Sequence, residues 1–517
     1  MSQQARDSGA SPLPDHSRSY WLDSTKQTEF PALDRDLSTD VTVIGGGITG
    51  ILTAYLLAEE GFQVTLLEGS RLFHGTTGNT TAKLTAQHGL IYADLLDTFG
   101  LDQTRLYYEA NLRAMQWAEQ IINAKQIPCQ LQKQDAYVYT QSEDKLSQME
   151  KEMRAYEQLG IPGRLAESSP LPFPVKYALK MENQAQFHPL AFLSFFVSEL
   201  ADNKTQVYEH TRAFQIDKAE GDWLVRTESG NTVRSTHVIQ CSHFPVFDEK
   251  GFYFARLYAE RSYAVAAKIK QPYPGGMYIN AESPTRSLRS LTIKGESFAI
   301  VGGENHKAGQ DTGTLKRYAA LEAFANEAFE VEQVAYRWST QDVITLDKAP
   351  YIGRMTEDTP NLWVATGYRK WGMTNSIAAA HLLHKLVLGQ ADPYAEVVDP
   401  SRFKANPSIK NLIVQNADVA KQLISGKFDS EGADPEQLGL DEGSVCIWKG
   451  QRAGVYKDTQ GKLHIVDTTC THMGCEVHWN QSERTWDCPC HGSRFDIDGL
   501  VLEGPAVEPL KTFANFP

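Results

Sequence analysis

The 517-residue chain is too long for one ordinary hydrophobic core, so we expect two or three domains. Its 41% hydrophobic and 22% charged residues are typical of a globular protein, and its net charge of −14 argues against a nucleic-acid partner. No stretch reaches the roughly 18 apolar residues of a membrane span, and the polar, proline-containing tail at 1–37 lacks a secretory signal. The sequence therefore predicts a cytoplasmic protein with no membrane span.

The first predicted elements form a βαβ unit. A β-branched strand at 41–44 leads into Gly-Gly-Gly-Ile-Thr-Gly at 45–50, and apolar residues at helical spacing follow before a second strand at 63–67. A strand, glycine turn, helix and strand within roughly 30 residues are typical of a dinucleotide site. The pyrophosphate of such a ligand is favoured at the helix N-terminus, where free amides and the helix dipole attract an anion.

Each residue of this motif has a physical task. Gly45 permits the tight turn, Gly47 lets the backbone approach the pyrophosphate, and Gly50 lets helix and strand pack closely. Glu68, eighteen residues after Gly50, is placed to accept hydrogen bonds from ribose hydroxyls. Glycine turns also serve packing alone, but here the strand, the helix and the acidic residue all agree with dinucleotide binding.

Two later segments favour FAD over a nicotinamide cofactor. A glycine- and threonine-rich loop at 75–85 has no use in a nicotinamide domain, and a strand, glycine turn and helix start occupy 361–374. A second helix N-terminus suits the negative charge that develops on a reduced flavin. No second strand–GxGxxG–helix unit appears in the sequence. The candidate cofactor residues in the two segments are Thr76, Thr77, Thr81, Lys83, Gly367, Gly372, Met373 and Thr374.

The three motifs, in this order, resemble the D-amino-acid oxidase and glycine oxidase superfamily over about residues 38–400. The resemblance implies that the glycine turn at 45–50, called the fingerprint below, holds the ADP half of FAD. It implies that the threonine loop at 75–85 runs beside the isoalloxazine, and that the glycine turn at 365–372, called the late turn below, closes the site. It also implies an α/β FAD-binding domain with a Rossmann-like parallel sheet, built from about 38–90, 205–250 and 335–400. The intervening segments would form a substrate domain with a mixed antiparallel sheet.

One departure from that family concerns the substrate. In glycine oxidase-like relatives, a segment reading roughly WxGxRPxTxDGxPxIG carries an arginine that pairs with the substrate carboxylate, and here Asp342 stands in its place. A buried carboxylate favours a cation, so one hypothesis is an amine substrate without an adjacent carboxylate. The alternative is that Asp342 turns away or caps a turn. By its place in the late turn, Lys370 is either near the flavin or a solvated, structural lysine.

The last part of the chain predicts a separate unit. A helical pattern and a polar stretch at 401–435 read as a linker, and short strands between glycine turns predict a small all-β domain at 436–517. Cys-Thr-His-Met-Gly-Cys at 470–475 and Cys-Pro-Cys-His-Gly-Ser at 488–493 could hold zinc or an iron–sulfur cluster. The arrangement favours iron, because each loop offers one Cys and one His, whereas zinc fingers usually group like ligands together.

These two loops resemble the ligand loops of Rieske proteins. The ligands of a [2Fe–2S] cluster that the resemblance implies are Cys470, His472, Cys488 and His491. It also implies a disulfide between Cys475 and Cys490 and a hydrogen bond from Ser493 to a bridging sulfide. Phe495 stands where high-potential members often have tyrosine, and the loss of that hydroxyl predicts a lower reduction potential.

A two-electron FAD and a one-electron cluster in one chain would form a converter. We therefore expect a dehydrogenase that oxidises a small amine or amino acid and passes electrons singly to an external acceptor. The alternatives are electron flow in the reverse direction, from an external donor, and a non-catalytic electron carrier. A Rieske oxygenase would need a mononuclear iron site after the cluster, and only 26 residues follow His491.

Overall fold

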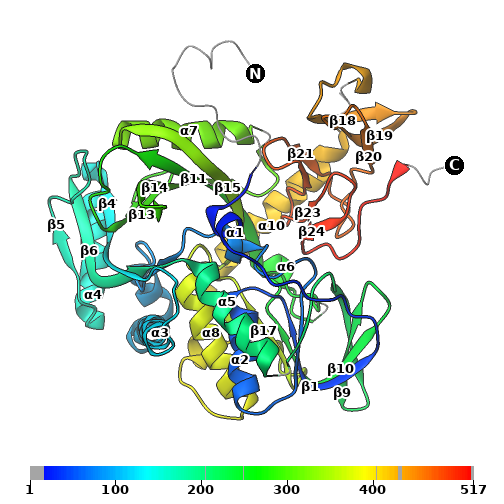
Figure 1. Cartoon of the computed structure of the whole chain (residues 1–517), viewed down its shortest axis with the longest axis horizontal. Helices are drawn as coiled ribbons and strands as arrows, with labels where there is room; N and C mark the ends of the chain where they lie inside the picture. The colour runs from blue at the N-terminus through cyan, green and yellow to red at the C-terminus, as the bar shows by residue number, and fades with distance from the viewer. Residues whose placement is uncertain are drawn as a thin grey trace.

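The computed structural model describes residues 17–513, apart from 204, 249, 312, 403–404 and 429–433. The start of the predicted tail and part of the predicted linker therefore lie outside the described residues. Two large sheets with surrounding helices are followed by a small β-rich unit, drawn orange to red in Figure 1. Among the described residues, no helix combines the length and apolarity that a membrane crossing requires.

The first sheet has eight strands and is the Rossmann-like sheet that the sequence predicts. Its strands are β1 (Leu37–Ile44), β2 (Val64–Leu67), β7 (Gln206–Tyr208), β8 (Ala213–Ala219), β9 (Asp222–Thr227), β10 (Thr232–Gln240), β16 (Tyr351–Arg354) and β17 (Leu362–Thr366). Five of them run parallel in the order β17-β10-β1-β2-β7, with β16 antiparallel at the edge and the β8–β9 hairpin joined to β10. All four residues of β2 and the last four of β1 are buried, as expected of strands covered on both faces.

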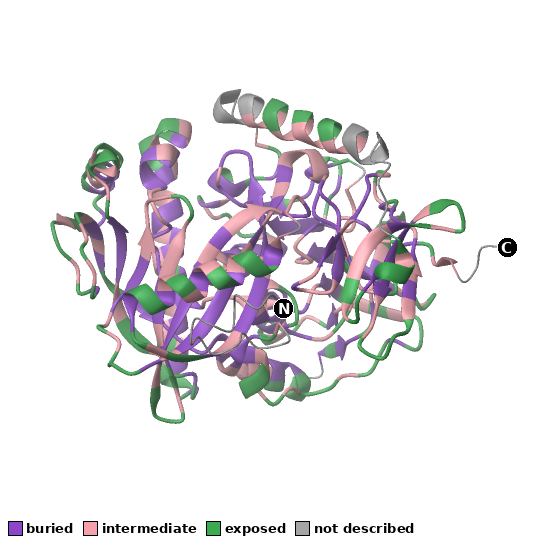
Figure 2. Ribbon diagram, turned by 90° about the horizontal axis from the view of Figure 1, so that it is seen from above, coloured by how far each residue is buried: buried purple, intermediate pink, exposed green. Residues whose placement is uncertain are grey.

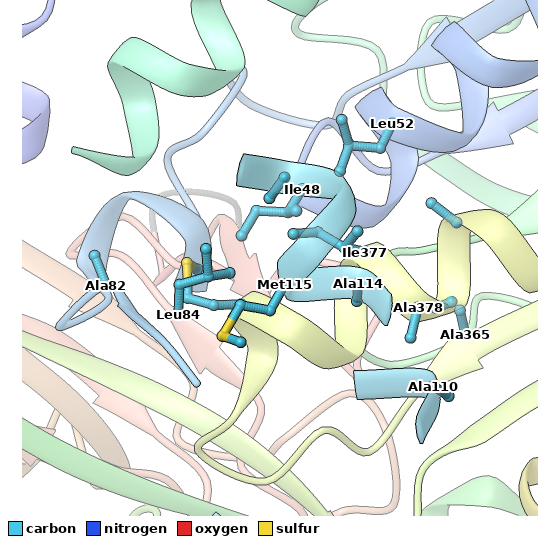
Figure 3. Close-up of a cluster of buried hydrophobic side chains, with 14 of the residues drawn as sticks. Ile48, Leu52, Ala82, Leu84, Ala110, Ala114, Met115, Ala365, Ile377 and Ala378 are labelled. Carbon is cyan, nitrogen blue, oxygen red and sulfur yellow. The ribbon is translucent and has the colours of Figure 1, made fainter. Parts of the chain in front are cut away.

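The helices beside this sheet share one core with the predicted FAD segments. They are α2 (Ile48–Glu59), α3 (Tyr92–Ala124), α5 (Pro189–Asp202) and α8 (Gly372–Val387). Figure 3 shows the core where α2, α3, β17 and α8 meet the end of the threonine loop, with Ile48, Leu52, Ala82, Leu84, Ala110, Ala114, Met115, Ala365, Ile377 and Ala378. Helix α3 has a kink at Gly100, whose φ is 77°.

The second sheet has nine strands and is mixed, as predicted for the substrate domain. Its strands are β3 (Lys83–Leu84), β4 (Gln132–Thr140), β5 (Arg164–Ala166), β6 (Tyr177–Gln186), β11 (Leu257–Ile269), β12 (Met277–Asn280), β13 (Arg286–Ile293), β14 (Glu296–Lys307) and β15 (Val331–Thr345). Their order is β15-β11-β14-β13-β12-β4-β6-β3, with β5 paired to β6. Helix α7 (Thr314–Ala328) crosses this sheet (Figure 1), and α4 (Leu146–Leu159) lies beside α3. Buried residues follow the central strands, whereas exposed ones gather on helix surfaces and loop tips (Figure 2).

Strand β15 lies in this second sheet, although the resemblance assigns residues from 335 onward to the FAD-binding part. It pairs with β11 along almost its whole length, from Leu257 opposite Thr345 to Ile269 opposite Val331. Alternate side chains of such a pair point to opposite faces. One face packs under α7, and the other joins the core of α2 and α8. The β11–β15 pair therefore separates the core beneath α7 from the core around α2 and α8.

The C-terminal unit is all-β, as predicted. Its strands are β18 (Glu442–Trp448), β19 (Gln451–Lys457), β20 (Leu463–Val466), β21 (His478–Asn480), β22 (Thr485–Asp487), β23 (Arg494–Phe495) and β24 (Val501–Glu503). They form a three-stranded and a four-stranded sheet around the buried side chains of Trp486 and Phe495. The remaining helices are α1 (Tyr20–Ser24), α6 (Tyr253–Arg256), α9 (Ala395–Val398) and α10 (Ala405–Phe428), with 3-10 turns η2 (Thr76–Asn79), η3 (Glu143–Lys145) and η4 (Pro435–Gln437).

Candidate active site and metal centre

The glycine turn between β1 and α2 leaves no room for side chains. A Cβ on Gly50 would lie 1.9 Å from the carbonyl oxygen of Gly45, and one on Gly45 would lie 2.6 Å from that of Cys241. Gly47 caps α2 with no side-chain hydrogen bond, so the cap itself occupies none of the amides in the first turn of the helix. The turn is therefore a backbone cradle that fits a pyrophosphate.

Glu68 follows β2 and ties the glycine turn to the next loop. Its carboxylate accepts hydrogen bonds of 2.8 Å from the amides of Gly46 and Ser70. Burial raises the pKa of this carboxyl, and the two backbone hydrogen bonds oppose that rise. The carboxylate stands at the end of β2, the place from which ribose recognition is predicted.

Hydrogen bonds join the threonine loop and the late turn to helix α2, which follows the glycine turn. The amide of Ile48 donates to Oγ1 of Thr77 in the threonine loop at 3.1 Å. The hydroxyls of Thr49 and Tyr368, which lies in the late turn, are 3.0 Å apart. The three motifs, far apart in sequence, therefore converge on one site.

His88 joins the threonine loop to the start of α8, and sequence reasoning missed it because a lone histidine in a loop carries no pattern. Its Nε2 lies 3.0 Å from both the Thr85 carbonyl oxygen and Oγ1 of Thr374, and its Nδ1 lies 2.7 Å from the Tyr107 hydroxyl. The imidazole stacks on Trp371 with ring centroids 5.1 Å apart. Burial lowers the pKa of His88 to about 3, so this imidazole is neutral at physiological pH.

The late turn itself is tightly packed. Gly367 has a φ of 80°, and a Cβ there would lie 2.4 Å from Cγ2 of Thr345. Gly372 begins α8, whose first turn has no side-chain cap, and Met373 is buried in the core behind it. The geometry agrees with a second helix N-terminus aimed at the cofactor site.

Lys83 is buried in the second sheet. Its ammonium donates to the Tyr278 carbonyl oxygen and to Oγ of Ser287, each at 2.6 Å. Burial, and secondarily Arg289, lowers the pKa of Lys83 to about 7. The Thr81 carbonyl oxygen accepts a hydrogen bond from Arg289 at 3.0 Å, so a second buried cation borders the loop. A cofactor contact by Lys83 stays a prediction.

Asp342 and Lys370 lie together on the face of the β11–β15 pair opposite α7. Asp342 lies within β15, directly across from Glu260 on β11. Lys370 Nζ is 3.2 Å from Oε2 of Glu260 and donates to Oγ of Ser262 at 2.6 Å. Burial raises the pKa of Asp342 to about 7, with Lys370 lowering it and Glu260 raising it further. The side chain of Asp342 is buried, at 6% exposure, and its role at the site stays a prediction.

Two thiols and two imidazoles converge in the C-terminal domain. The thiols of Cys470 and Cys488 lie within hydrogen-bonding reach, and the hydroxyl of Ser493 lies within reach of Cys470. The rings of His472 and His491 are perpendicular, with centroids 5.0 Å apart. Nδ1 of His491 is buried and has no hydrogen-bond partner among the described residues. A buried nitrogen without a partner, on the loop that also carries the Cys488 thiol, fits a metal ligand.

Cys475 and Cys490 form a disulfide, which confirms the pairing that the resemblance implies. Their sulfurs and that of Cys488 all lie within 4.8 Å of one another. Because disulfide sulfurs supply no thiolate, these two cysteines shape the ligand loops and leave ligation to the others. Phe495, buried in β23, presents no hydroxyl to the cluster site.

The cluster loops lie against the oxidoreductase part of the chain, a contact that sequence reasoning missed. Phe254 in α6 has its ring centroid 5.7 Å from that of His472 and 5.8 Å from that of His491. His491 is buried, at 4% exposure, while His472 is half-buried. Gly492 packs so closely that a Cβ there would lie 2.6 Å from Cβ of Ala259 on β11.

A buried ion network crosses the same interface. Arg261 of β11 is fully buried and lies 3.8 Å from carboxylate oxygens of both Asp487 and Glu503. Arg494 pairs with the same two acids at 3.3 and 3.0 Å. Two arginines and two carboxylates balance, which is the condition under which buried charges are tolerated. Buried ion pairs therefore hold the C-terminal domain against the oxidoreductase domain.

Comparison with known proteins decides between zinc and an iron–sulfur cluster in the C-terminal domain. The FAD dependent oxidoreductase family (DAO) matches residues 40–386, and the Rieske [2Fe-2S] domain matches residues 433–514. The chain belongs to the FAD-dependent oxidoreductase family. This oxidoreductase also carries a C-terminal Rieske domain, so its cofactors are FAD and a [2Fe–2S] cluster, and structural zinc is excluded as the reading of the four ligands.

Similar proteins share part or all of this architecture. The oxidoreductase is 47% identical over 492 residues to "Putative Rieske 2Fe-2S iron-sulfur protein YhfW" of Bacillus subtilis, covering 95% of this chain and 96% of the relative. It is 24% identical over 410 residues to gamma-glutamylputrescine oxidoreductase of Escherichia coli, covering 74% and 91%. Glycine oxidase from Geobacillus kaustophilus shares the fold with a TM-score of 0.60 at 17% identity, over 71% of this chain and 99% of that one.

Proposed function

We propose that this oxidoreductase is a dehydrogenase that oxidises a small amine or amino acid and passes the electrons singly through its Rieske cluster to an external acceptor. One observation carries the proposal. The β11–β15 pair presents Glu260 and Asp342 on one face and Arg261 and Gln341, which contact the Rieske domain, on the other. A substrate site and an electron outlet would then lie on opposite sides of the same two strands.

The acidic groups on the first face support an amine-bearing substrate. Asp342 is buried, and Glu260 lies opposite it on the neighbouring strand. A substrate ammonium would supply positive charge to these two acids, because an opposite charge stabilises a buried carboxylate. The names of the relatives agree, since gamma-glutamylputrescine oxidoreductase, glycine oxidase and L-proline dehydrogenase all refer to amines or amino acids.

The chain's own residues would hold the cofactor and exclude water. The fingerprint amides would bind the pyrophosphate, Glu68 the ribose, and the threonine loop with the start of α8 the isoalloxazine. Bound FAD would accept the two electrons and the hydrogen that leave the substrate. His88 would position these segments and, being neutral, would not serve as an acid.

The exposure of the cluster ligands supports an external acceptor. His491 is covered by the oxidoreductase domain, whereas His472 is half-buried and its neighbour Met473 is 48% exposed. The buried histidine would face the internal donor, and the accessible edge would face the acceptor.

An anaerobic metabolite screen tests the proposal. Holoprotein is mixed with amines and α-amino acids while flavin bleaching and the cluster signal are followed together. We expect at least one amine or amino acid to reduce both cofactors. A flavin that bleaches with dithionite and with no metabolite would identify a carrier instead. Asp342→Asn is expected to lose any preference for amines over α-amino acids, and an unchanged preference would reject Asp342 as the ammonium partner.

A further inference from the structure

We propose that Gln341 is the residue that couples the flavin site to the cluster. This inference rests on the proposed internal electron transfer. Its side-chain Nε2 donates to the carbonyl oxygen of Gly492 at 2.7 Å, and Gly492 directly follows the ligand His491. Its own carbonyl oxygen accepts a hydrogen bond of 3.1 Å from Oγ1 of Thr76 in the threonine loop. One residue thus contacts the segments that hold both cofactors.

The orientation of the Gln341 amide is fixed by its neighbour. Arg261 donates through Nη2 to Oε1 of Gln341 at 3.1 Å. Because arginine has donors and no acceptor, the amide oxygen must face Arg261, and the amide nitrogen must face Gly492. Gln341 is 1% exposed, so water does not compete for these bonds. The bridge is therefore held in one geometry.

This bridge is a continuous chain of covalent and hydrogen bonds, unlike the ring contact of Phe254 at the same interface. From His491 the route follows the backbone to Gly492, one hydrogen bond to Gln341, the Gln341 side chain and backbone, and a second hydrogen bond to Thr76. The contact of Phe254 with His491 is only a van der Waals approach of two rings. Electrons tunnel more readily through covalent and hydrogen bonds than across gaps.

The electron balance of each transfer is simple. One electron leaves the reduced flavin and one enters the oxidised cluster, and the proton released on the flavin side goes to water. An external one-electron acceptor then reoxidises the cluster before the second electron follows. Gln341 is a positioning residue here, since it gains and loses no electron itself.

The test compares two glutamines that cross the same interface. Gln341→Met removes the bond to Gly492 while keeping the side-chain length. Gln310→Met is the matched control, because Nε2 of Gln310 donates to the Pro489 carbonyl oxygen at 3.2 Å but has no bond to the threonine loop. Flavin in anaerobic holoprotein is reduced by a light flash with an external photoreductant, and the appearance of the reduced cluster is timed. No substrate is needed, so failure here is distinct from failure of the proposed reaction.

We expect Gln341→Met to slow cluster reduction about 10- to 100-fold, the usual loss when a residue supporting a metal ligand is removed. Gln310→Met should keep the wild-type rate, and FAD content, iron content and the cluster's EPR spectrum should be unchanged in both. Equal rates in wild type and Gln341→Met, or equal slowing in both variants, would overturn the proposal. If Gln341→Met fails to fold, Thr76→Val cuts the route at its other end. A wild-type rate in FAD-loaded Thr76→Val would overturn it equally.

Discussion

The ring of Phe254 lies 5.8 Å from the ring of His491, so a residue of the FAD-dependent oxidoreductase domain covers a predicted ligand of the Rieske cluster. The same phenylalanine lies 5.7 Å from His472. The histidine edge of the cluster is therefore partly occupied by the chain's own flavin domain. The apolar shell of a metal site controls solvent access and reduction potential, so this contact should affect both.

Removal of the Phe254 ring should open the cluster to small oxidants. In Phe254→Ala, we expect ferricyanide to oxidise the reduced cluster about tenfold faster, because the shell that limits access is lost. Stopped-flow absorbance of the cluster measures the rate. Phe252→Ala is the matched control, since Phe252 is 58% exposed and its ring lies 6.2 Å from that of Phe254. Identical rates in Phe254→Ala and wild type would show that the ring does not shield the cluster.

Gly50→Ala should abolish FAD binding. The added Cβ would lie 1.9 Å from the Gly45 carbonyl oxygen, and the turn that cradles the pyrophosphate would have to open. Purified protein should then lack flavin absorbance but keep its iron, because the Rieske domain is separate. Gly75→Ala is the control, since a Cβ there meets nothing within 4 Å. Full flavin content in Gly50→Ala would refute the placement of the pyrophosphate.

Asp342→Asn should stabilise the protein at high pH. Burial raises the pKa of Asp342 to about 7 in the folded state, against an ordinary value of 3.8, so ionisation opposes folding as pH rises between these values. The variant should gain up to about 4 kcal/mol near pH 8 and little near pH 4. Thermal unfolding across this pH range measures the difference. The exposed Asp358→Asn should show no such trend, and a pH-independent gain in Asp342→Asn would contradict the buried ionisation.

Loss of the disulfide should destabilise the Rieske domain. Cys475 and Cys490 are 15 residues apart, and closing a loop of this length is worth about 3 kcal/mol. Cys475→Ala/Cys490→Ala should therefore release its cluster at lower denaturant concentration, as followed by visible absorbance. Cys446→Ala changes a buried free thiol of the same domain and serves as the control. A midpoint for cluster loss equal to that of the control would contradict a stabilising bridge.

Sequence reasoning succeeded where the determinants are local. The turn from Gly45 to Gly50 and the spacing from Cys470 to His491 carry their chemistry within short segments. The interface was missed because it depends on long-range packing, and Gln341 and Gly492, for example, are 151 positions apart. Phe254 gave no signal, since a phenylalanine beside a strand usually belongs to a core.

The environment of Asp342 could be predicted only in part from the sequence. The departure from the family motif drew attention to the residue, but its partner Glu260 became visible only when β11 and β15 paired. Strand register is set by burial and turns along the whole sheet, and no local pattern around Asp342 specifies it. The same pairing explains why β15 lies in the second sheet although its sequence borders the FAD-binding part.

We propose that flavin and cluster exchange electrons within one chain. The most direct measurement is the rate of cluster reduction after flash reduction of the flavin, taken anaerobically over a series of protein concentrations. We expect one rate constant at every concentration, because donor and acceptor are docked in the same molecule. A rate proportional to protein concentration, or a reduced flavin beside a cluster that stays oxidised, would contradict it.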